Sequence, residues 1–211
     1  MVSTPVVKEG MPYIIALAIV TAIVGFFHPL WAVLPGGLLL FVTYFFRNPQ
    51  RSIPQECGII VSPADGRVMS VTEFYEDQFI KGPARKVNIF LSVFDVHVNR
   101  IPVAGTIKYQ QYTKGKFLPA WREDVSTENE RHTLGIENDC MKVLVTQIAG
   151  LIARRIVSWV TVGNTLRQGE RYGLIKFGSS TEVIVPAHVE ITVKKGDTVR
   201  GGETVIGRMR Q

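Results

Sequence analysis

Hydrophobic and polar positions divide the chain into two parts of different character. Residues 10–46 contain no Asp, Glu, Lys or Arg, and a bilayer core needs about 20 apolar residues for each helical span. The run is interrupted at His28-Pro29 and at Pro35-Gly36-Gly37, because proline removes a backbone donor and glycine loosens a helix. The pattern predicts a hairpin of two short apolar helices, Tyr13–Phe27 and Leu30–Phe46.

This apolar hairpin is expected to attach the chain to a membrane. Lys8 precedes it and Arg47 and Arg51 follow it, which favours both ends on the cytoplasmic side of the cell membrane. The pattern leaves open whether the helices cross the bilayer or only dip into it. A cleaved signal peptide is the alternative, but no small-x-small cleavage site precedes a polar mature sequence. We therefore expect two parts, a membrane hairpin at 1–46 and a soluble domain at 47–211.

From residue 56 onward the pattern changes to short β-type runs separated by glycine and proline. Long amphipathic helices are missing, apart from a helical turn expected near Pro119–Asp124. The pattern predicts a mainly β domain, a sandwich or a barrel. The expected strands are Gly58–Val61, Arg67–Phe74, Lys86–Val93, Thr106–Tyr112, Met141–Ile148, Ile156–Val160, Tyr172–Phe177, Glu182–Val185, Val189–Val193 and Thr204–Met209.

Two stretches of this β part are similar to each other. Ile59–Val68 and Val183–Val189 each read as strand, proline, turn and strand, and the second continues through Gly-Asp and Gly turns to Gly207. This arrangement resembles the barrel-sandwich hairpins of lipoyl and biotinyl domains, which present a lysine at the hairpin tip. The tip here, Ala64-Asp65-Gly66, has no lysine. We expect a barrel-sandwich-hybrid-like fold without the carrier function.

Charge and cysteine content exclude several classes of function. The net charge is +6, but basic and acidic residues are interleaved, so an anionic membrane surface explains the excess better than nucleic acid does. Cys57 and Cys140 are too few for a disulfide framework or a zinc site. His132 and His188 have no partner pattern and are interpreted as structural or surface residues. No metal site is expected.

The bond between Gly178 and Ser179 carries a specific chemical option. A Gly-Ser pair is ordinarily a turn. If the turn is strained and a base lies nearby, the Ser179 hydroxyl can attack the Gly178 carbonyl to form an ester, because glycine leaves that carbonyl uncrowded. β-Elimination and loss of ammonia would then leave a pyruvoyl group at residue 179.

Five segments in order resemble the phosphatidylserine decarboxylase family, from about residue 45 to the C-terminus. The resemblance is to its compact proenzyme type. The segments are Phe46-Arg47-Asn48-Pro49, Ser62-Pro63-Ala64-Asp65-Gly66-Arg67-Val68, Phe90-Leu91-Ser92-Val93-Phe94-Asp95-Val96-His97-Val98-Asn99-Arg100, Glu128-Asn129-Glu130-Arg131 and Gly173-Leu174-Ile175-Lys176-Phe177-Gly178-Ser179-Ser180.

The resemblance implies a role for each of five residues. Gly178–Ser179 matches the self-cleavage bond, and Ser179 the future pyruvoyl cofactor. Asp65 matches the aspartate that supports a histidine in an Asp-His-Ser relay, and His97 lies in the motif that supplies histidines to that site. Longer relatives have a second histidine where this chain has Arg100. This departure leaves the base duties of His97 open, and Arg100 could instead bind a lipid phosphate or the substrate carboxylate.

The resemblance also implies the reaction. The proenzyme would split into a large β chain, 1–178, and a small α chain, 179–211, which stay together as a heterodimer, with higher assembly left open. The pyruvoyl ketone would form a Schiff base with the amine of phosphatidylserine and accept electrons as carbon dioxide leaves, giving phosphatidylethanolamine. His97 is the expected proton donor. The alternatives are archaetidylserine as substrate, or a noncatalytic membrane-tethered adaptor with the same hybrid motif.

Overall fold

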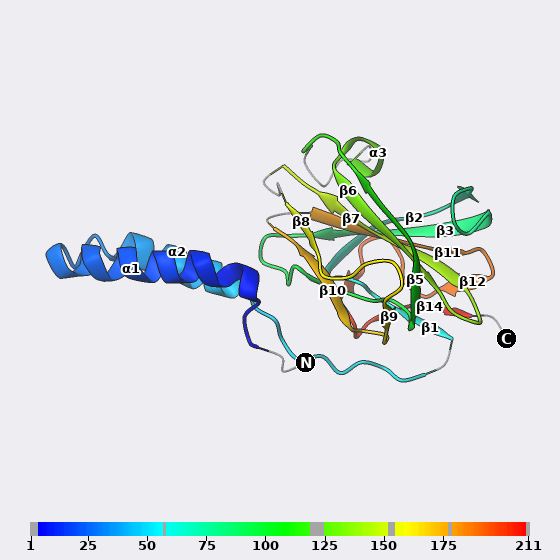
Figure 1. Cartoon of the computed structure of the whole chain (residues 1–211), viewed down its shortest axis with the longest axis horizontal. Coiled ribbons are helices and arrows are strands. Elements are labelled where there is room, and N and C mark those ends of the chain that lie inside the picture. The colour runs from blue at the N-terminus through cyan, green and yellow to red at the C-terminus, as the bar shows by residue number, and fades with distance from the viewer. Residues whose placement is uncertain (1–3, 57, 119–124, 152–154, 177–178, 210–211) are drawn as a thin grey trace. The chain divides into compact units, whose positions relative to one another are not determined.

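The computed structural model describes residues 4–56, 58–118, 125–151, 155–176 and 179–209. The chain divides into two compact units, residues 1–50 and residues 51–211. The first unit is helical, and the regular elements of the second are strands apart from one short helix (Figure 1). The mainly β fold with an N-terminal apolar hairpin, as predicted from the sequence, is confirmed.

The first unit is a helical hairpin. A 3-10 turn, Lys8–Gly10, leads into α1, Met11–Phe27, and α2 covers Val33–Phe45. The expected break at Pro35-Gly36-Gly37 was wrong: Pro35 lies in the first turn of α2, where a backbone N–H has no intrahelical partner to lose. Among the described residues, Lys8–Phe27 is the one helical stretch that is long and apolar enough to cross a membrane.

The base of the hairpin is closed by the segment that follows α2. The side-chain amide of Asn48 donates to the Thr4 carbonyl at 2.9 Å, and its backbone N–H donates to the Pro5 carbonyl at 2.7 Å. A Cβ at Gly10 would lie 2.6 Å from the Cβ of Phe46, so glycine is needed for this close approach. The Phe46–Pro49 motif therefore ties the two ends of the hairpin together.

The second unit is organised around one eight-stranded sheet, which curls over the smaller sheets (Figure 1). Its strand order is β13-β2-β3-β11-β7-β6-β5-β9. Every pairing within it is antiparallel. The strands are β2 Gly66–Glu76, β3 Gly82–Leu91, β5 Gly105–Thr113, β6 Arg131–Glu137, β7 Lys142–Ala149, β9 Thr165–Leu166, β11 Ser179–Pro186 and β13 Thr198–Val199.

Two three-stranded sheets complete the unit, in the orders β1-β14-β12 and β4-β10-β8. They contain β1 Ile59–Val61, β4 Val98–Arg100, β8 Ile156–Ser158, β10 Arg171–Ile175, β12 Val189–Ile191 and β14 Val205–Met209, and a short helix, α3 Val125–Glu128, precedes β6. The two similar stretches of sequence pair with each other, because β1 lies against β14 and β2 lies against β13.

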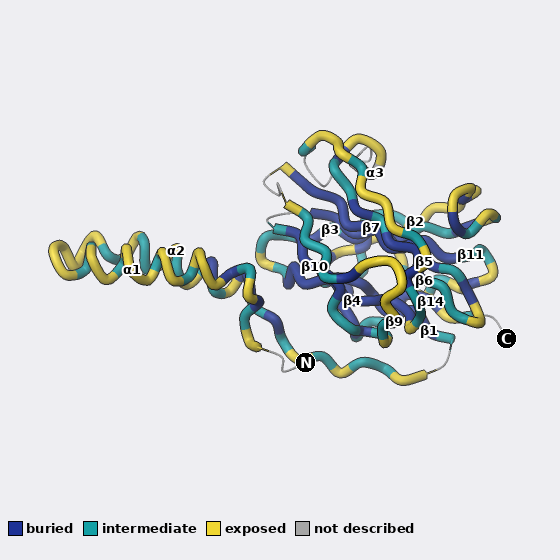
Figure 2. The backbone as a smooth tube through the Cα atoms, in the orientation of Figure 1, coloured by how far each residue is buried: buried dark blue, intermediate teal, exposed yellow. Residues whose placement is uncertain are grey.

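The core of this unit lies between the sheets, and β11 runs through its middle. The burial map in Figure 2 shows β11, β7 and β10 as almost continuously buried strands. Both flanking strands of β11 belong to the same sheet, so its backbone is paired on both sides. Because β11 is buried on both faces, buried and exposed positions do not alternate along it, and its sequence lacks the alternating apolar and polar pattern of a half-exposed strand.

Four strands were not predicted from the sequence: β4, β6, β9 and β13. Three of them have only two or three residues, which is too short for alternation to be detected. The remaining one, β6, contains charged residues at both ends and Gly135 in its interior. The helical turn expected near Pro119–Asp124 lies outside the described residues.

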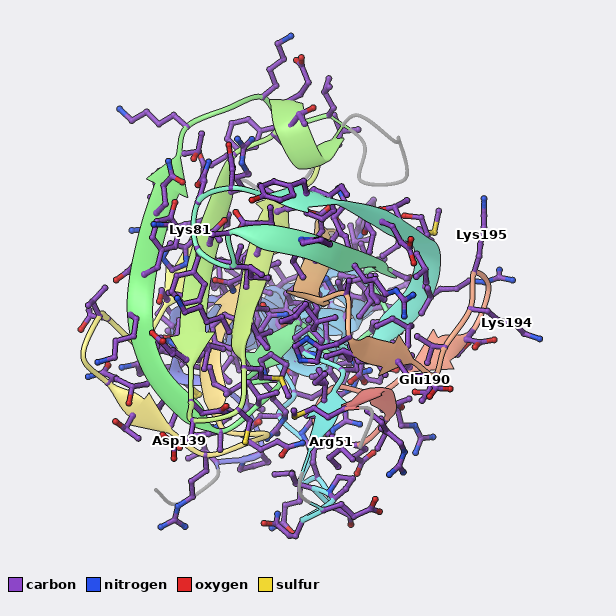
Figure 3. All side chains as sticks on the ribbon, turned by 90° about the vertical axis from the view of Figure 1, so that its right-hand side faces the viewer. Arg51, Lys81, Asp139, Glu190, Lys194 and Lys195 are labelled. Carbon is purple, nitrogen blue, oxygen red and sulfur yellow. The ribbon has the colours of Figure 1, made fainter. Side chains whose placement is uncertain are left out.

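Glu76 organises the turn between β2 and β3, which ends at Lys81 (Figure 3). Its carboxylate accepts backbone N–H bonds from Gln78, Phe79 and Ile80 at 2.6–2.9 Å. Burial raises the pKa of Glu76, but the backbone donors together outweigh burial and hold its pKa below the ordinary value. The stability that Glu76 contributes is therefore present at neutral pH and lost as the pH falls through its lowered folded-state pKa.

Replacing Glu76 by Gln is expected to lower the free energy of unfolding by about 1–3 kcal/mol at pH 7, because charge-assisted bonds are lost. Urea unfolding in detergent at pH 7 and pH 3 measures this, and the difference from wild type should shrink at pH 3. Glu73→Gln is the control, since Glu73 is exposed and pairs with Arg85 at the surface, a type of pair worth about 0–1 kcal/mol. Equal effects of the two substitutions at pH 7 would contradict the assignment.

Candidate active site

Ser179 is the first residue of β11 and lies in the interior of the sheet. It is opposite Leu91 of β3 on one side and Ala149 of β7 on the other. Its side chain is fully buried, and its Oγ has no hydrogen-bond partner among the described residues. An unpaired buried hydroxyl costs about 1–3 kcal/mol, so such a group calls for an explanation such as a catalytic role. Gly178 lies outside the described residues.

The structure brings His97 to the strand that leads into this serine. The backbone N–H of Ile175, the last residue of β10, donates to the His97 carbonyl at 3.3 Å. Leu91, opposite Ser179, begins the turn that ends at His97. The turn from 92 to 96 therefore connects Leu91, which is opposite Ser179, to His97, which accepts the Ile175 N–H. His97 directly precedes β4 and Ser179 begins β11, so this topology connects the segments that carry them, although β4 and β11 belong to different sheets.

The orientation of the His97 ring is set within its own turn. Its Nδ1 lies 3.0 Å from the Asp95 carbonyl oxygen. The Asp95 side chain in turn accepts the Ser92 N–H at 2.8 Å, and the Asp95 N–H donates to the Ser92 carbonyl. Because a carbonyl can only accept, Nδ1 carries the proton and Nε2 is the basic nitrogen. This is the tautomer that a general base requires.

Asp65 has partners other than His97. Its carboxylate receives two bonds from the Arg51 guanidinium, at 2.9 and 2.7 Å, and one from the Gly201 N–H at 2.8 Å. Arg51 also pairs with Glu203 at 3.2 Å, and Figure 3 shows Arg51 on the segment that enters the β unit. Among the described residues no hydrogen bond joins Asp65 to His97, and the relay role of Asp65 stays a prediction.

Arg100 belongs to the same charged cluster as Asp65. Asn99 and Arg100 are consecutive in β4, so their side chains point to opposite faces. The Arg100 guanidinium is buried and donates to the Gly169 carbonyl at 3.0 Å. Burial, with the nearby charges of Arg51 and Arg171, lowers the pKa of Arg100 to about 10. The predicted contact of Arg100 with substrate remains a prediction.

Sequence reasoning missed a set of buried polar side chains next to Ser179. The Asn99 amide donates to Thr181 Oγ1 at 3.3 Å, and Gln147 donates to Asn99 at 2.8 Å. His132, expected to be structural or exposed, is buried and lies 3.4 Å from the Gln147 oxygen. One signal was available: Asn99 follows His97 by two positions, the spacing of residues on one face of a strand.

Asn129, in the Glu128–Arg131 motif, fixes the end of β7 beside Ser179. Its amide donates to the Ala149 carbonyl at 2.7 Å and to the Leu118 carbonyl at 2.9 Å, and its oxygen accepts the Leu118 N–H. Ala149 is the residue opposite Ser179. Among the described residues no group of three or more His, Cys, Asp or Glu side chains could hold a metal ion.

Comparison with known proteins agrees with this arrangement. The family model for phosphatidylserine decarboxylase matches residues 38–207. The chain belongs to the phosphatidylserine decarboxylase family. A phosphatidylserine decarboxylase proenzyme of Symbiobacterium thermophilum is 52% identical over 98% of this chain and 96% of its own length. The proenzyme of Carboxydothermus hydrogenoformans is 51% identical over 96% of each chain, and that of Syntrophus aciditrophicus 42% over 96% of each.

This family assignment makes the chain a carboxy-lyase of phospholipid biosynthesis that is made as a proenzyme. The resemblance noted in the sequence is thereby confirmed. The site fits a cofactor made from the chain itself, because the described residues place a buried, unpartnered serine hydroxyl at the start of a central strand.

The Asp65 cluster predicts how two substitutions compare. Arg51→Met and Asp65→Asn each break the same partly buried pair, so each should lower the free energy of unfolding by about 1–3 kcal/mol and slow any self-cleavage to a similar extent. Denaturant unfolding and intact mass spectrometry measure the two effects. Arg208→Met, which breaks an exposed pair with Glu56, is the control. Loss of cleavage in Asp65→Asn alone, with Arg51→Met unaffected, would instead support the relay.

Proposed function

We propose that the chain is a self-cleaving, pyruvoyl-dependent enzyme that converts phosphatidylserine to phosphatidylethanolamine and carbon dioxide. The observation that carries the proposal is the Ser179 hydroxyl, buried and without a partner among the described residues, at the first position of β11. His97, whose Nε2 is the basic nitrogen, lies at the end of β10 that leads to it. The family assignment supports the same reaction.

Self-cleavage begins at Ser179. His97 Nε2 takes the hydroxyl proton, Oγ attacks the Gly178 carbonyl, and the peptide bond is exchanged for an ester. Loss of the Cα proton breaks the Cβ–O bond, which releases residues 1–178 as a carboxylate and leaves dehydroalanine at position 179. Water then replaces the nitrogen of the tautomerised imine, and ammonia leaves. The net reaction consumes one water and releases one ammonia.

The two products of cleavage would remain associated. The described part of the small chain, residues 179–209, supplies β11, β12, β13 and β14. β11 lies between β3 and β7 of the large chain, and β14 pairs with β1. Removing the small chain would expose much of the core, open one edge of β3 and of β7, and leave β1 without its partner strand, so we propose a stable heterodimer.

The residues around the new cofactor fit a decarboxylase. When formed, the pyruvoyl carbonyl supplies an electron sink for the substrate amine. Burial of position 179 excludes water, which strengthens electrostatic interactions in the site. His97 Nε2, once protonated, is the donor that returns a proton to the substrate carbon after carbon dioxide has left. The headgroup chemistry is the same for an archaetidylserine substrate.

The experiment that tests the proposal is intact mass spectrometry of the purified chain. Wild type should give two polypeptides that part between Gly178 and Ser179, the smaller lighter by one ammonia than hydrolysis would leave. Ser179→Ala should stay as one chain of 23.5 kDa and lack decarboxylase activity, because it has neither nucleophile nor pyruvoyl precursor.

Ser180→Ala is the matched control, since Ser180 is also buried with an unpartnered hydroxyl but does not follow a glycine. It should still cleave at the same bond. A wild-type chain that stays intact after long incubation at neutral pH would overturn the proposal and favour the noncatalytic adaptor, which should behave alike with serine or alanine at 179.

Lipid access to the site has a structural basis in two exposed apolar side chains. Phe94 is 63% exposed in the turn that follows Leu91, and Leu151 is 54% exposed in the segment that follows Ala149. Leu91 and Ala149 are the two residues opposite Ser179, so Phe94 and Leu151 lie in segments that leave the same end of the sheet. Exposed apolar groups of this kind insert into the bilayer interface. We propose that this end of the sheet meets the membrane that holds the substrate.

The double substitution Phe94→Ser with Leu151→Ser should lower activity on phosphatidylserine vesicles by about tenfold, because less apolar surface enters the bilayer. Self-cleavage and activity on detergent-dispersed substrate should stay unchanged. Val162→Ser is the control. Val162 is also exposed, at 55%, but the N–H of the next residue, Gly163, donates to the Ile107 carbonyl at the end of the sheet away from Ser179. Equal losses on both substrate forms would refute this orientation.

A further inference from the structure

A chain of buried side-chain hydrogen bonds ends two residues from Ser179. Gln110 Nε2 lies 2.9 Å from His132 Nε2, and His132 Nδ1 lies 3.4 Å from the Gln147 oxygen. Gln147 donates to the Asn99 oxygen at 2.8 Å, and the Asn99 amide donates to Thr181 Oγ1 at 3.3 Å. His132, Gln147, Asn99 and Thr181 are each at most 4% exposed.

Every bond in this chain runs in the same direction. Gln110 donates to His132 Nε2, so Nδ1 carries the proton of a neutral imidazole and donates to the Gln147 oxygen. Burial lowers the pKa of His132, although the Gln147 bond opposes this, and the low pKa favours that neutral form. Each amide then accepts with its oxygen and donates with its nitrogen. The series terminates on the Thr181 hydroxyl.

The chain crosses from one sheet to the other beside the proposed catalytic pair. Thr181 is opposite Gln147, and Gln147 is opposite His132, so these three form one row across β11, β7 and β6. Asn99 belongs to β4 in the other sheet. Ser179 lies two residues before Thr181 on the same face of β11. His97 lies two residues before Asn99, and its carbonyl accepts the Ile175 N–H, which continues the pairing of β10 with β4.

The glycine that opens the Gly173–Ser180 motif is explained by this crossing. Gly173 is opposite Asn99 in the β10–β4 pairing. A Cβ at Gly173 would lie 3.0 Å from Gln147 Nε2 and 2.3 Å from the Val157 carbonyl oxygen. The Val157 carbonyl of β8 therefore requires glycine at 173, and the missing side chain also leaves room for the Gln147 amide that holds Asn99.

We propose that Asn99, Gln147 and Thr181 are positioning residues that set the distance between His97 and the Ser179 hydroxyl. The inference rests on the proposed self-cleavage and adds the residues that align it. Ser179 Oγ has no partner among the described residues, so its position is set by its strand. The Asn99–Thr181 bond is the adjacent cross-link to β4, the strand that His97 directly precedes. Attack requires reacting atoms about 3–3.5 Å apart, and a displacement of about 1 Å can cost 100-fold in rate.

The test compares three substitutions in the full-length proenzyme. Thr181→Val keeps the shape of the side chain but removes the hydroxyl, and should slow self-cleavage about tenfold or more. Thr181→Ser keeps the hydroxyl and should restore a near wild-type rate. Thr146→Val is the matched control. Thr146 is a buried threonine of β7 whose hydroxyl makes a hydrogen bond to Thr133 at 3.0 Å, and this bond does not belong to the series that ends at Thr181.

Rates would be followed by intact mass spectrometry at temperatures well below unfolding, with the free energy of unfolding measured for each variant. Thr181→Val and Thr146→Val should lose similar stability, and only Thr181→Val should cleave slowly. Wild-type cleavage in Thr181→Val, or equal slowing in both, would reduce the network to a stabilising role and overturn the inference. A wild-type chain that never cleaves would be a failure of the proposed function itself.

Discussion

The double pairing of β11 constrains the rest of the β unit. β3 and β7 hold it on both sides from its first residue, and the registers Ser179–Leu91 and Ser179–Ala149 place that residue in the interior. The chain must therefore leave one sheet at Ile175 and enter the other at Ser179 within a few residues. The Ser179 hydroxyl at this entry point is removed from water.

The site is assembled by two sheets, neither of which is sufficient alone. The small sheet carries Asn99, with His97 in the segment just before β4, and the large sheet carries Ser179 and Thr181. Backbone hydrogen bonds fix the order within each sheet, but only side chains can fix one sheet against the other. The Asn99–Thr181 and Gln147–Asn99 bonds are such connections, and burial makes an unmade bond costly there.

The charged residues Asp65 and Arg100 make structural contacts in this part of the fold. Asp65 joins Arg51 to Gly201, so it ties the segment entering the β unit to the C-terminal hairpin. Arg100 lies close to the charges of that cluster and donates to the Gly169 carbonyl. The ring of His97 is oriented by the Asp95 carbonyl oxygen, which lies 3.0 Å from its Nδ1.

Local pattern was enough to predict the apolar hairpin, the mainly β fold and the longer strands, because hydrophobic periodicity and the absence of charge are properties of neighbouring residues. The ordered motifs were enough to identify the family, and the roles they imply for Ser179 and His97 remain predictions. Sequence could not reveal that Asp65 pairs with Arg51, nor that Gln147 and His132 lie in one row with Thr181, because these contacts join residues far apart in the chain. Their registers are set by the packing of whole strands, and only the tertiary structure decides that.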